Sequence, residues 1–277
     1  MAHTHTHGSG SHQHEHQHGG LAEILDLDAE VLADFHQEVF AMVGAAAVER
    51  PHVVDLGAGT GVGSIALARA LPGAMVTAVD VDQEMLDHLG HKAEAAGVAE
   101  RVRTVQADLD QPWPDLGAVD LVWASASMHH MASPAEALGR AFAALRPGGV
   151  FAVSELEGFP LFLPDGPEAD VERRAHAVMA DMRQEAGLHM YEDWAARLRG
   201  AGFEPVEERR FEINLLPPLP GAAGRYAQVS LQRMHERLGE RLSPADLGTL
   251  EKVAASIPGR TDLAIRTTRT VYLAHRP

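Results

Sequence analysis

The 277-residue chain contains no cysteine and little lysine. Without cysteine there is no disulfide, no thiolate nucleophile and no cysteine-ligated zinc site. Lysine occurs only at Lys92 and Lys252, and the net charge is -16 with histidine neutral. A chain this acidic is poorly suited to bind the phosphates of a nucleic acid independently of its sequence. We therefore expect no nucleic-acid partner.

Long apolar runs are also lacking. No run reaches the length of a transmembrane helix, and none typical of a signal peptide follows the N-terminus. We therefore expect a cytoplasmic protein without a membrane partner. Hydrophobic residues make up 45% of the chain, which is ordinary for a globular protein, and the length allows one large domain or two small ones. Scarce lysine beside abundant arginine and alanine suggests a GC-rich bacterial genome.

Histidines recur through residues 1–20 among threonine, glycine, serine and glutamine. No hydrophobic core can form from this composition, so we expect a disordered His-rich tail, native or added for purification. The alternative is a tail that captures divalent metal adventitiously, because neutral imidazoles bind zinc, nickel and copper. Apolar residues at helical spacing then predict one helix over residues 21–44. We expect His36 on this helix to be half-exposed rather than part of a site.

The segment 53–71 opens as a buried strand, breaks into alternating glycines and continues as a helix. Strand, glycine turn and helix form the first unit of a doubly wound α/β domain, which binds ligands at the carboxyl ends of its strands. The dinucleotide fingerprint G-x-G-x-x-G/A fits only from Gly61, with Gly63 and Ala66, and that match lies too far into the helix. From Gly57 or Gly59 its third glycine falls on Val62 or Ser64. No lysine follows the glycines, which excludes a phosphate loop of the Walker A type.

Acidic and histidine residues follow the later strand-like segments. Two of these segments end at Asp80 and Asp108. Asp80 lies 25 positions after Asp55, close to where a ribose-binding carboxylate belongs. The next apolar segment runs directly into His129 and His130. Polar side chains at successive strand ends predict a ligand site at that edge of the sheet.

The pattern D-x-G-x-G-x-G in this chain resembles motif I of the class I S-adenosylmethionine (SAM)-dependent methyltransferases, of the small-molecule type. The acidic strand ends, the paired histidines and an LRPGG turn at 145–149 follow in the family's order, over about residues 45–156. Met128 stands where the family often has leucine. The resemblance implies SAM contacts from the glycine turn and from the ends of the next three strands: Asp55, Gly57, Ala58, Gly59, Gly61, Asp80, Val81, Ala107, Asp108, Leu109, Ala124 and Ser125.

The resemblance also implies a fold, namely an α/β, doubly wound, Rossmann-like sheet of seven strands with an antiparallel terminal strand. The methyltransferase domain would span 45–277, with the helix 21–44 over the cofactor pocket. Residues 157–190 and 216–262 are additional, and we expect these two insertions to form a mainly helical cap, since connections this long usually serve function. The alternative is that they thicken the core or form the face of a homodimer.

A SAM-dependent methyltransferase moves a methyl group by in-line displacement, requires no metal, and needs a base only for some acceptors. His129 and His130 are the candidate catalytic bases, because imidazole titrates near neutral pH. The alternative is that both only shape the pocket. We expect a small-molecule acceptor, with O-, N- and C-methylation left open. Two other functions stay open: a SAM-binding or metal-handling protein of this fold without methyl transfer, and a nicotinamide-dependent oxidoreductase, which the missing third glycine argues against.

Overall fold

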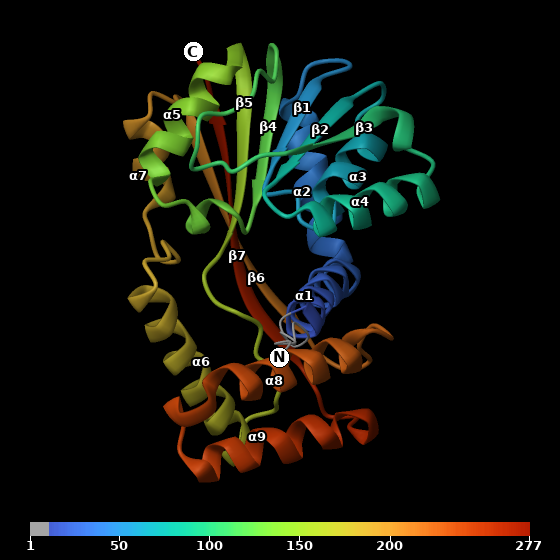
Figure 1. Cartoon of the computed structure of the whole chain (residues 1–277), viewed down its shortest axis with the longest axis vertical. Coiled ribbons are helices and arrows are strands. Elements are labelled where there is room, and N and C mark those ends of the chain that lie inside the picture. The colour runs from blue at the N-terminus through green and yellow to red at the C-terminus, as the bar shows by residue number, and fades with distance from the viewer. Residues whose placement is uncertain (1–10) are drawn as a thin grey trace, which may run out of the picture.

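The computed structural model describes residues 11–277, and its centre is a seven-stranded sheet in the order β3-β2-β1-β4-β5-β7-β6. The five strands β1 to β5 pair in parallel, whereas β7 pairs antiparallel with both β5 and β6 (Figure 1). The predicted fold is therefore confirmed. The strands are β1 (His52–Leu56), β2 (Met75–Asp80), β3 (Val102–Gln106), β4 (Val119–Ser125), β5 (Leu145–Leu156), β6 (Val206–Leu215) and β7 (Ile265–His275).

Helices cover both faces of the sheet because successive strand side chains point to opposite sides. In β4, Leu121 and Trp123 join the core under α2 and α3, whereas Val122 and Ala124 join the core under α5 and α7. The helices are α1 (Ser11–Val31), α2 (Ala33–Ala46), α3 (Val62–Ala70), α4 (Gln83–Ala95), α5 (Pro134–Ala144), α6 (Pro167–Glu185), α7 (Trp194–Gly200), α8 (Ala223–Leu238) and α9 (Pro244–Ser256).

The N-terminal segment differs from the prediction in two ways. The single helix expected over 21–44 is two helices, α1 and α2, which meet at Leu32. Helix α1 also begins at Ser11, so it extends into the segment 1–20 for which we predicted a disordered tail. Extending an existing helix adds one hydrogen bond per residue ordered, so a helix can continue into polar sequence that would not nucleate one. Residues 1–10 of the His-rich tail lie outside the described residues.

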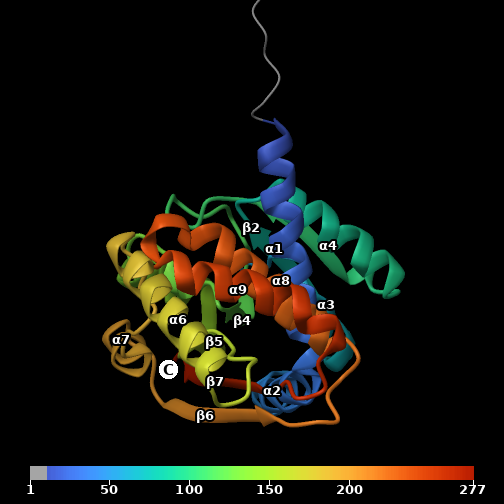
Figure 2. The same ribbon diagram turned by 90° about the horizontal axis from the view of Figure 1, so that it is seen from below.

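Helices α6, α8 and α9 form a layer beyond the carboxyl ends of the parallel strands. Helix α8 packs against α9, α6 and α1. Seen from below, these helices lie in front of β4 and β5 (Figure 2). The two predicted cap segments, 157–190 and 216–262, contribute the helices of this layer. None of the helices in the described part of the chain is long and apolar enough to cross a membrane.

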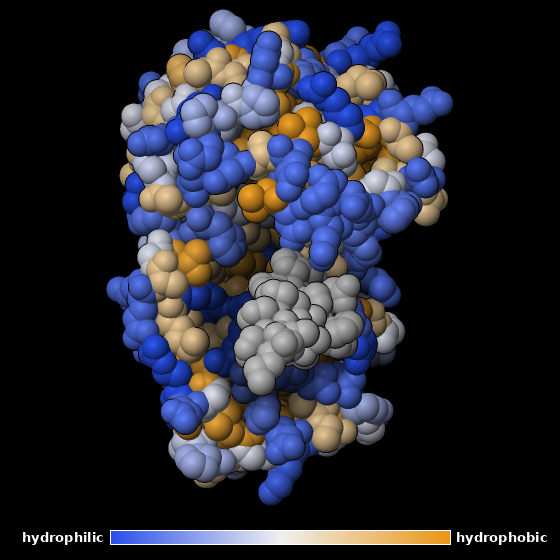
Figure 3. All heavy atoms as spheres, viewed as in Figure 1, coloured by the Kyte–Doolittle hydropathy of each residue, from blue (hydrophilic) through white to orange (hydrophobic). Residues whose placement is uncertain are grey.

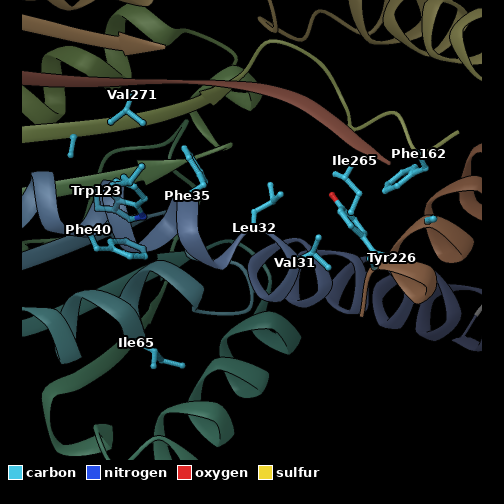
Figure 4. Close-up of a cluster of buried hydrophobic side chains, with 14 of the residues drawn as sticks. Val31, Leu32, Phe35, Phe40, Ile65, Trp123, Phe162, Tyr226, Ile265 and Val271 are labelled. Carbon is cyan, nitrogen blue, oxygen red and sulfur yellow. The ribbon is translucent and has the colours of Figure 1, made fainter. Parts of the chain in front are cut away.

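One continuous hydrophobic cluster joins this layer to the sheet. At the sheet end, the rings of Phe40 and Trp123 lie with their centroids 5.4 Å apart. At the other end, Phe162 packs edge-to-face on Tyr226 of α8, with centroids 5.1 Å apart. Figure 4 shows Leu32 between these two pairs. The cap and the sheet therefore share one hydrophobic core, which fixes the position of the cap over the strand ends.

Candidate active site

A cavity of about 520 Å³ opens at the carboxyl ends of β1, β2 and β4. The turns that follow these strands form its floor, and α1 and α2 close one side of it. This position is the crevice in which doubly wound sheets bind ligands. Its lining residues include Leu25, Asp28, His36, Asp55, Gly57, Ala58, Gly59, Asp80, Val81, Asp82, Ala107, Asp108, Leu109, Asp110, Ser125, Ser127 and His130.

The structure brings together all but two of the residues predicted to contact the cofactor. The exceptions are Gly61 and Ala124, which do not line the cavity. Gly61 begins α3 with φ of 79°, and a Cβ on it would lie 2.3 Å from Cγ of Leu89. Ala124 is fully buried inside β4. We infer that Gly61 is required by packing between α3 and α4 rather than by direct contact with a ligand.

Asp80, at the end of β2, fixes the glycine turn. Its Oδ2 accepts a hydrogen bond of 2.8 Å from the backbone N–H of Gly59, and its Oδ1 accepts one of 3.0 Å from that of Asp82. Each carboxylate oxygen has a second lone pair. Asp80 therefore orients the turn and still has acceptor sites that face the cavity.

Asp55, at the end of β1, lies deeper than Asp80 and is only 2% exposed. The hydroxyl of Ser64 donates to its Oδ2 over 2.6 Å. Burial raises the pKa of Asp55 to about 7; the Ser64 hydrogen bond opposes this shift and the charge of Asp80 adds to it. A positively charged ligand in the cavity would favour the ionised form of this carboxyl.

Asp108 and Leu109 form the third wall, after β3. Oδ1 of Asp108 accepts a hydrogen bond of 2.9 Å from the N–H of Asp110, so this side chain also caps its own turn. The carbonyl of Leu109 accepts hydrogen bonds from the Trp113 indole and the Arg140 guanidinium, both at 2.9 Å. These hydrogen bonds fix the part of the cavity rim that was predicted to bind the cofactor.

The two predicted bases occupy different places in the short turn Met128–His130 that follows β4. His130 lines the cavity, whereas His129 lies behind it and is 3% exposed. Nδ1 of His129 donates to Oε2 of the buried Glu155 over 2.7 Å, and the two histidine rings have centroids 4.2 Å apart. The N–H of Met128 donates to the other oxygen of Glu155 over 3.0 Å. Glu155 thus fixes the turn, and His130 is the histidine that a ligand can touch.

The walls of the cavity change the basicity of His130. His130 is exposed at the wall of the cavity, but the protein around its ring removes part of the hydration of the imidazole. Desolvation, with a further contribution from His129, lowers the pKa of His130 to about 4. The imidazole is therefore neutral at neutral pH and is a weak base.

Two polar residues of the N-terminal helices, Asp28 and His36, line the cavity and were not predicted as site residues. Asp28 on α1 accepts hydrogen bonds from the Tyr226 hydroxyl and from Nη2 of Arg269, at 2.6 and 2.7 Å. Nε2 of His36 lies 3.8 Å from Asp28, and His36, which is half-exposed as expected, lines the cavity. Helical spacing marked the apolar face of this segment but gave no sign that its polar residues meet β7 and α8.

The cavity is acidic. Its aspartates are Asp28, Asp55, Asp80, Asp82, Asp108 and Asp110, and no lysine or arginine of the described chain belongs to its lining. Such a wall attracts a cationic ligand and repels a pyrophosphate. Among the side chains that the structure describes, residues 20–277, no group of three or more His, Asp or Glu is placed to hold a metal ion.

Comparison with known proteins agrees with this geometry. Residues 53–149 match a family model described as a methyltransferase domain. The 27-O-demethylrifamycin SV methyltransferase of Amycolatopsis mediterranei is 31% identical over 66% of this chain and 64% of its own length. A trans-aconitate 2-methyltransferase of Paracidovorax citrulli is 36% identical over 47% of this chain and 45% of its own. The chain thus spans less than two thirds of each of these relatives.

Among solved structures, the [4+2]-cyclase SpnF superposes with a TM-score of 0.52 at 20% identity, over 87% of this chain and 81% of its own. At this identity the likeness concerns the fold alone. One fold hosts several chemistries, so the reaction has to be argued from the site.

Proposed function

We propose, from the chain's membership of the class I SAM-dependent methyltransferases, that it transfers the methyl group of SAM to a small-molecule acceptor. The acidic cavity at the ends of β1, β2 and β4 carries this proposal. SAM is a cation, and it lacks the pyrophosphate of a nicotinamide dinucleotide. The charge of the lining therefore favours SAM over the competing cofactor.

The residues present fit the parts of this cofactor. Asp80 has free acceptor sites for the two ribose hydroxyls, and Asp108 with the backbone of Leu109 borders the space for adenine. Asp55 and Ser125 border the inner end, where the methionyl part belongs. When bound there, SAM supplies an electrophilic methyl group on a sulfonium. The glycine turn and the acidic strand ends bind and orient it.

His130 is the group of this chain best placed to contact the acceptor. Glu155 and His129 act through it, because their buried hydrogen bond holds the turn that carries His130. With a pKa of about 4, His130 can accept a hydrogen bond but is a poor base for a neutral hydroxyl. We therefore propose that it orients an acceptor that is already nucleophilic, and that proximity supplies most of the rate.

The cap suggests the class of acceptor. It covers the strand ends with α6, α8 and α9, which leaves room for a small molecule rather than for a nucleic acid in a chain of charge -16. The named relatives act on small molecules and come from bacteria. We propose a bacterial enzyme that works in the cytoplasm.

Calorimetry with S-adenosylhomocysteine (SAH), SAM and NAD tests the cofactor, and transfer of a labelled methyl group from SAM to a metabolite extract tests the reaction. We expect binding of SAH and SAM, no binding of NAD, and labelled small molecules. Asp80→Ala should weaken the binding of SAH, and Asp87→Ala, an exposed change on α4, is its control. Binding of NAD instead of SAH would contradict the proposal. Binding of SAH without label transfer would indicate that this fold performs another chemistry here.

A further inference from the structure

Arg183, in the last turn of α6, lacks the ion pair that most arginines of this chain have. Its guanidinium carbon lies 3.8 Å from the centroid of the Phe159 ring, in the loop after β5. The side chain is half-buried. In the described part of the chain no carboxylate lies within ion-pair distance of it. By contrast Arg174, on the same helix, pairs with Asp246 over 2.6 Å.

Two backbone hydrogen bonds place Arg183 beside the candidate active site. Its carbonyl accepts a bond of 3.0 Å from the N–H of Leu188, which closes the turn after α6. The next residue, His189, donates its N–H to the carbonyl of His129 over 2.9 Å. The end of α6 is thus tied to the turn that carries His130. Figure 3 shows the molecule hollowed between the part with the sheet and the part with the cap helices.

A second arginine, Arg237, lies in the last turn of α8, the helix that packs against α6. Arg241, one turn beyond Arg237, forms an ion pair with Glu185 over 2.9 Å. This pair joins the end of α6 to the residues that follow α8. Burial lowers the pKa of Arg183 to about 10, and the like charge of Arg237 lowers it further. Among the side chains that the structure describes, residues 20–277, no carboxylate forms an ion pair with Arg237. Arg183 and Arg237 thus bring two like charges to the adjoining helices α6 and α8, in a chain of net charge -16.

We propose that Arg183 and Arg237 bind an oxyanion group of the acceptor, a carboxylate or a phosphate, and so direct its other end toward His130 and the cofactor cavity. The planar guanidinium donates paired hydrogen bonds that match both groups. The aspartate-lined cavity binds the cationic cofactor, and the arginines of the cap bind the anionic acceptor, so charge directs each ligand to its own site. This inference rests on the proposed methyl transfer and names the acceptor class of that same site.

The test uses the full chain saturated with SAH. The probes are sodium succinate and glycerol 3-phosphate, with succinamide as the neutral control and sodium chloride at matched ionic strength. Titration calorimetry and thermal denaturation report binding. We expect at least one oxyanion to bind and to raise the melting temperature, and succinamide to do neither. Succinate binding identifies a carboxylate site, and glycerol 3-phosphate binding identifies a phosphate site.

Three variants separate a binding role from a structural one. Arg183→Gln and Arg237→Gln should each weaken oxyanion binding about tenfold or more, the loss expected for a charge-assisted bond. Arg237 is exposed, so its variant should fold normally. Arg174→Gln removes the same charge from the opposite face of α6, nine positions earlier, and should bind the probe like the wild type.

The outcomes are distinct. If neither oxyanion binds better than chloride, or if all three variants bind alike, the inference is wrong. If Arg183→Gln only lowers the melting temperature and keeps oxyanion affinity, Arg183 merely packs on Phe159 and the inference is again wrong. SAH binding distinguishes the two proposals. If the wild type does not bind SAH, the proposed function is wrong. If it binds SAH but no oxyanion, only the acceptor class is wrong.

Discussion

Replacing Asp28 by Asn should loosen the N-terminal helices from the rest of the molecule. Asp28 belongs to α1, and its Oδ1 accepts hydrogen bonds from Tyr226 of α8 and Arg269 of β7. Arg269 is 5% exposed. The three groups therefore join the cover of the cavity to the cap and to the sheet, and the variant leaves a buried guanidinium without its counter-charge.

The size of the effect follows from burial and charge. Burial alone would raise the pKa of Asp28, but Arg269, His36 and Tyr226 outweigh it and lower the pKa from 3.8 to about 2. At about 1.4 kcal/mol per pKa unit, the ionised carboxyl contributes about 2 kcal/mol to folding. Because the folded pKa lies below the unfolded one, this contribution is fully present above about pH 4 and is lost as the pH falls toward 2.

Breaking a buried pair from one side costs more, about 3–5 kcal/mol, because the other charge stays buried. For a chain of this size that lowers the melting temperature by about 10 °C. Urea denaturation of Asp28→Asn measures the loss, with the exposed Asp34→Asn as control. The double variant Asp28→Leu/Arg269→Leu should be more stable than the sum of the single changes predicts. SAH affinity should also fall, since α1 lines the cavity.

Three results would refute this reasoning. Asp28→Asn could lose less than about 0.5 kcal/mol, which is the range of an ordinary surface change. The double variant could show simple additivity, which would mean that the two side chains do not interact in the folded protein. The stability difference between wild type and variant could also stay constant from pH 5 to pH 2, rather than shrinking as Asp28 becomes protonated.

Other predictions concern the cavity itself. Asp80→Ala should weaken SAH binding about 10–150-fold, the effect of losing about 1.5–3 kcal/mol of charge-assisted bonding, and an unchanged calorimetric affinity would remove the ribose assignment. The pH profile of kcat should be flat from pH 5.5 to 8, because His130 with a pKa of about 4 is already neutral there; a rise centred near pH 6.5 would contradict this. Glu155→Gln should lower kcat with little effect on SAH affinity, because Glu155 positions the turn of His130. Gly61→Ala should destabilise the fold by about 1–3 kcal/mol in urea, and Leu89→Ala should relieve part of that loss, since Leu89 occupies the space of the new methyl group.

The sequence by itself determined the alternation of strands and helices and the edge of the sheet that carries the site. Both follow from local causes: apolar periodicity sets each element, and glycines set the turn after β1. Because parallel strands end at one edge, Asp55, Asp80 and Asp108 had to come together once the sheet formed, whatever else the chain did.

Only the tertiary structure decided which of two adjacent histidines faces the cavity. His129 and His130 are equivalent in the sequence, but the carboxylate of Glu155, 26 residues further on, binds one of them and leaves the other exposed. The direction of a side chain in a short turn depends on the element packed against it. No local pattern in the sequence carries that information.

The polar contacts between distant segments were decided in the same way. Asp28 meets Arg269 across 241 positions of sequence, and Arg183 of α6 is influenced by the charge of Arg237 because α6 and α8 pack together. Helical periodicity identifies which face of such a helix is buried, but not which side chains of another helix lie opposite. Which side chains meet depends on how the cap helices pack against the strand ends, and this packing exists only in the folded chain.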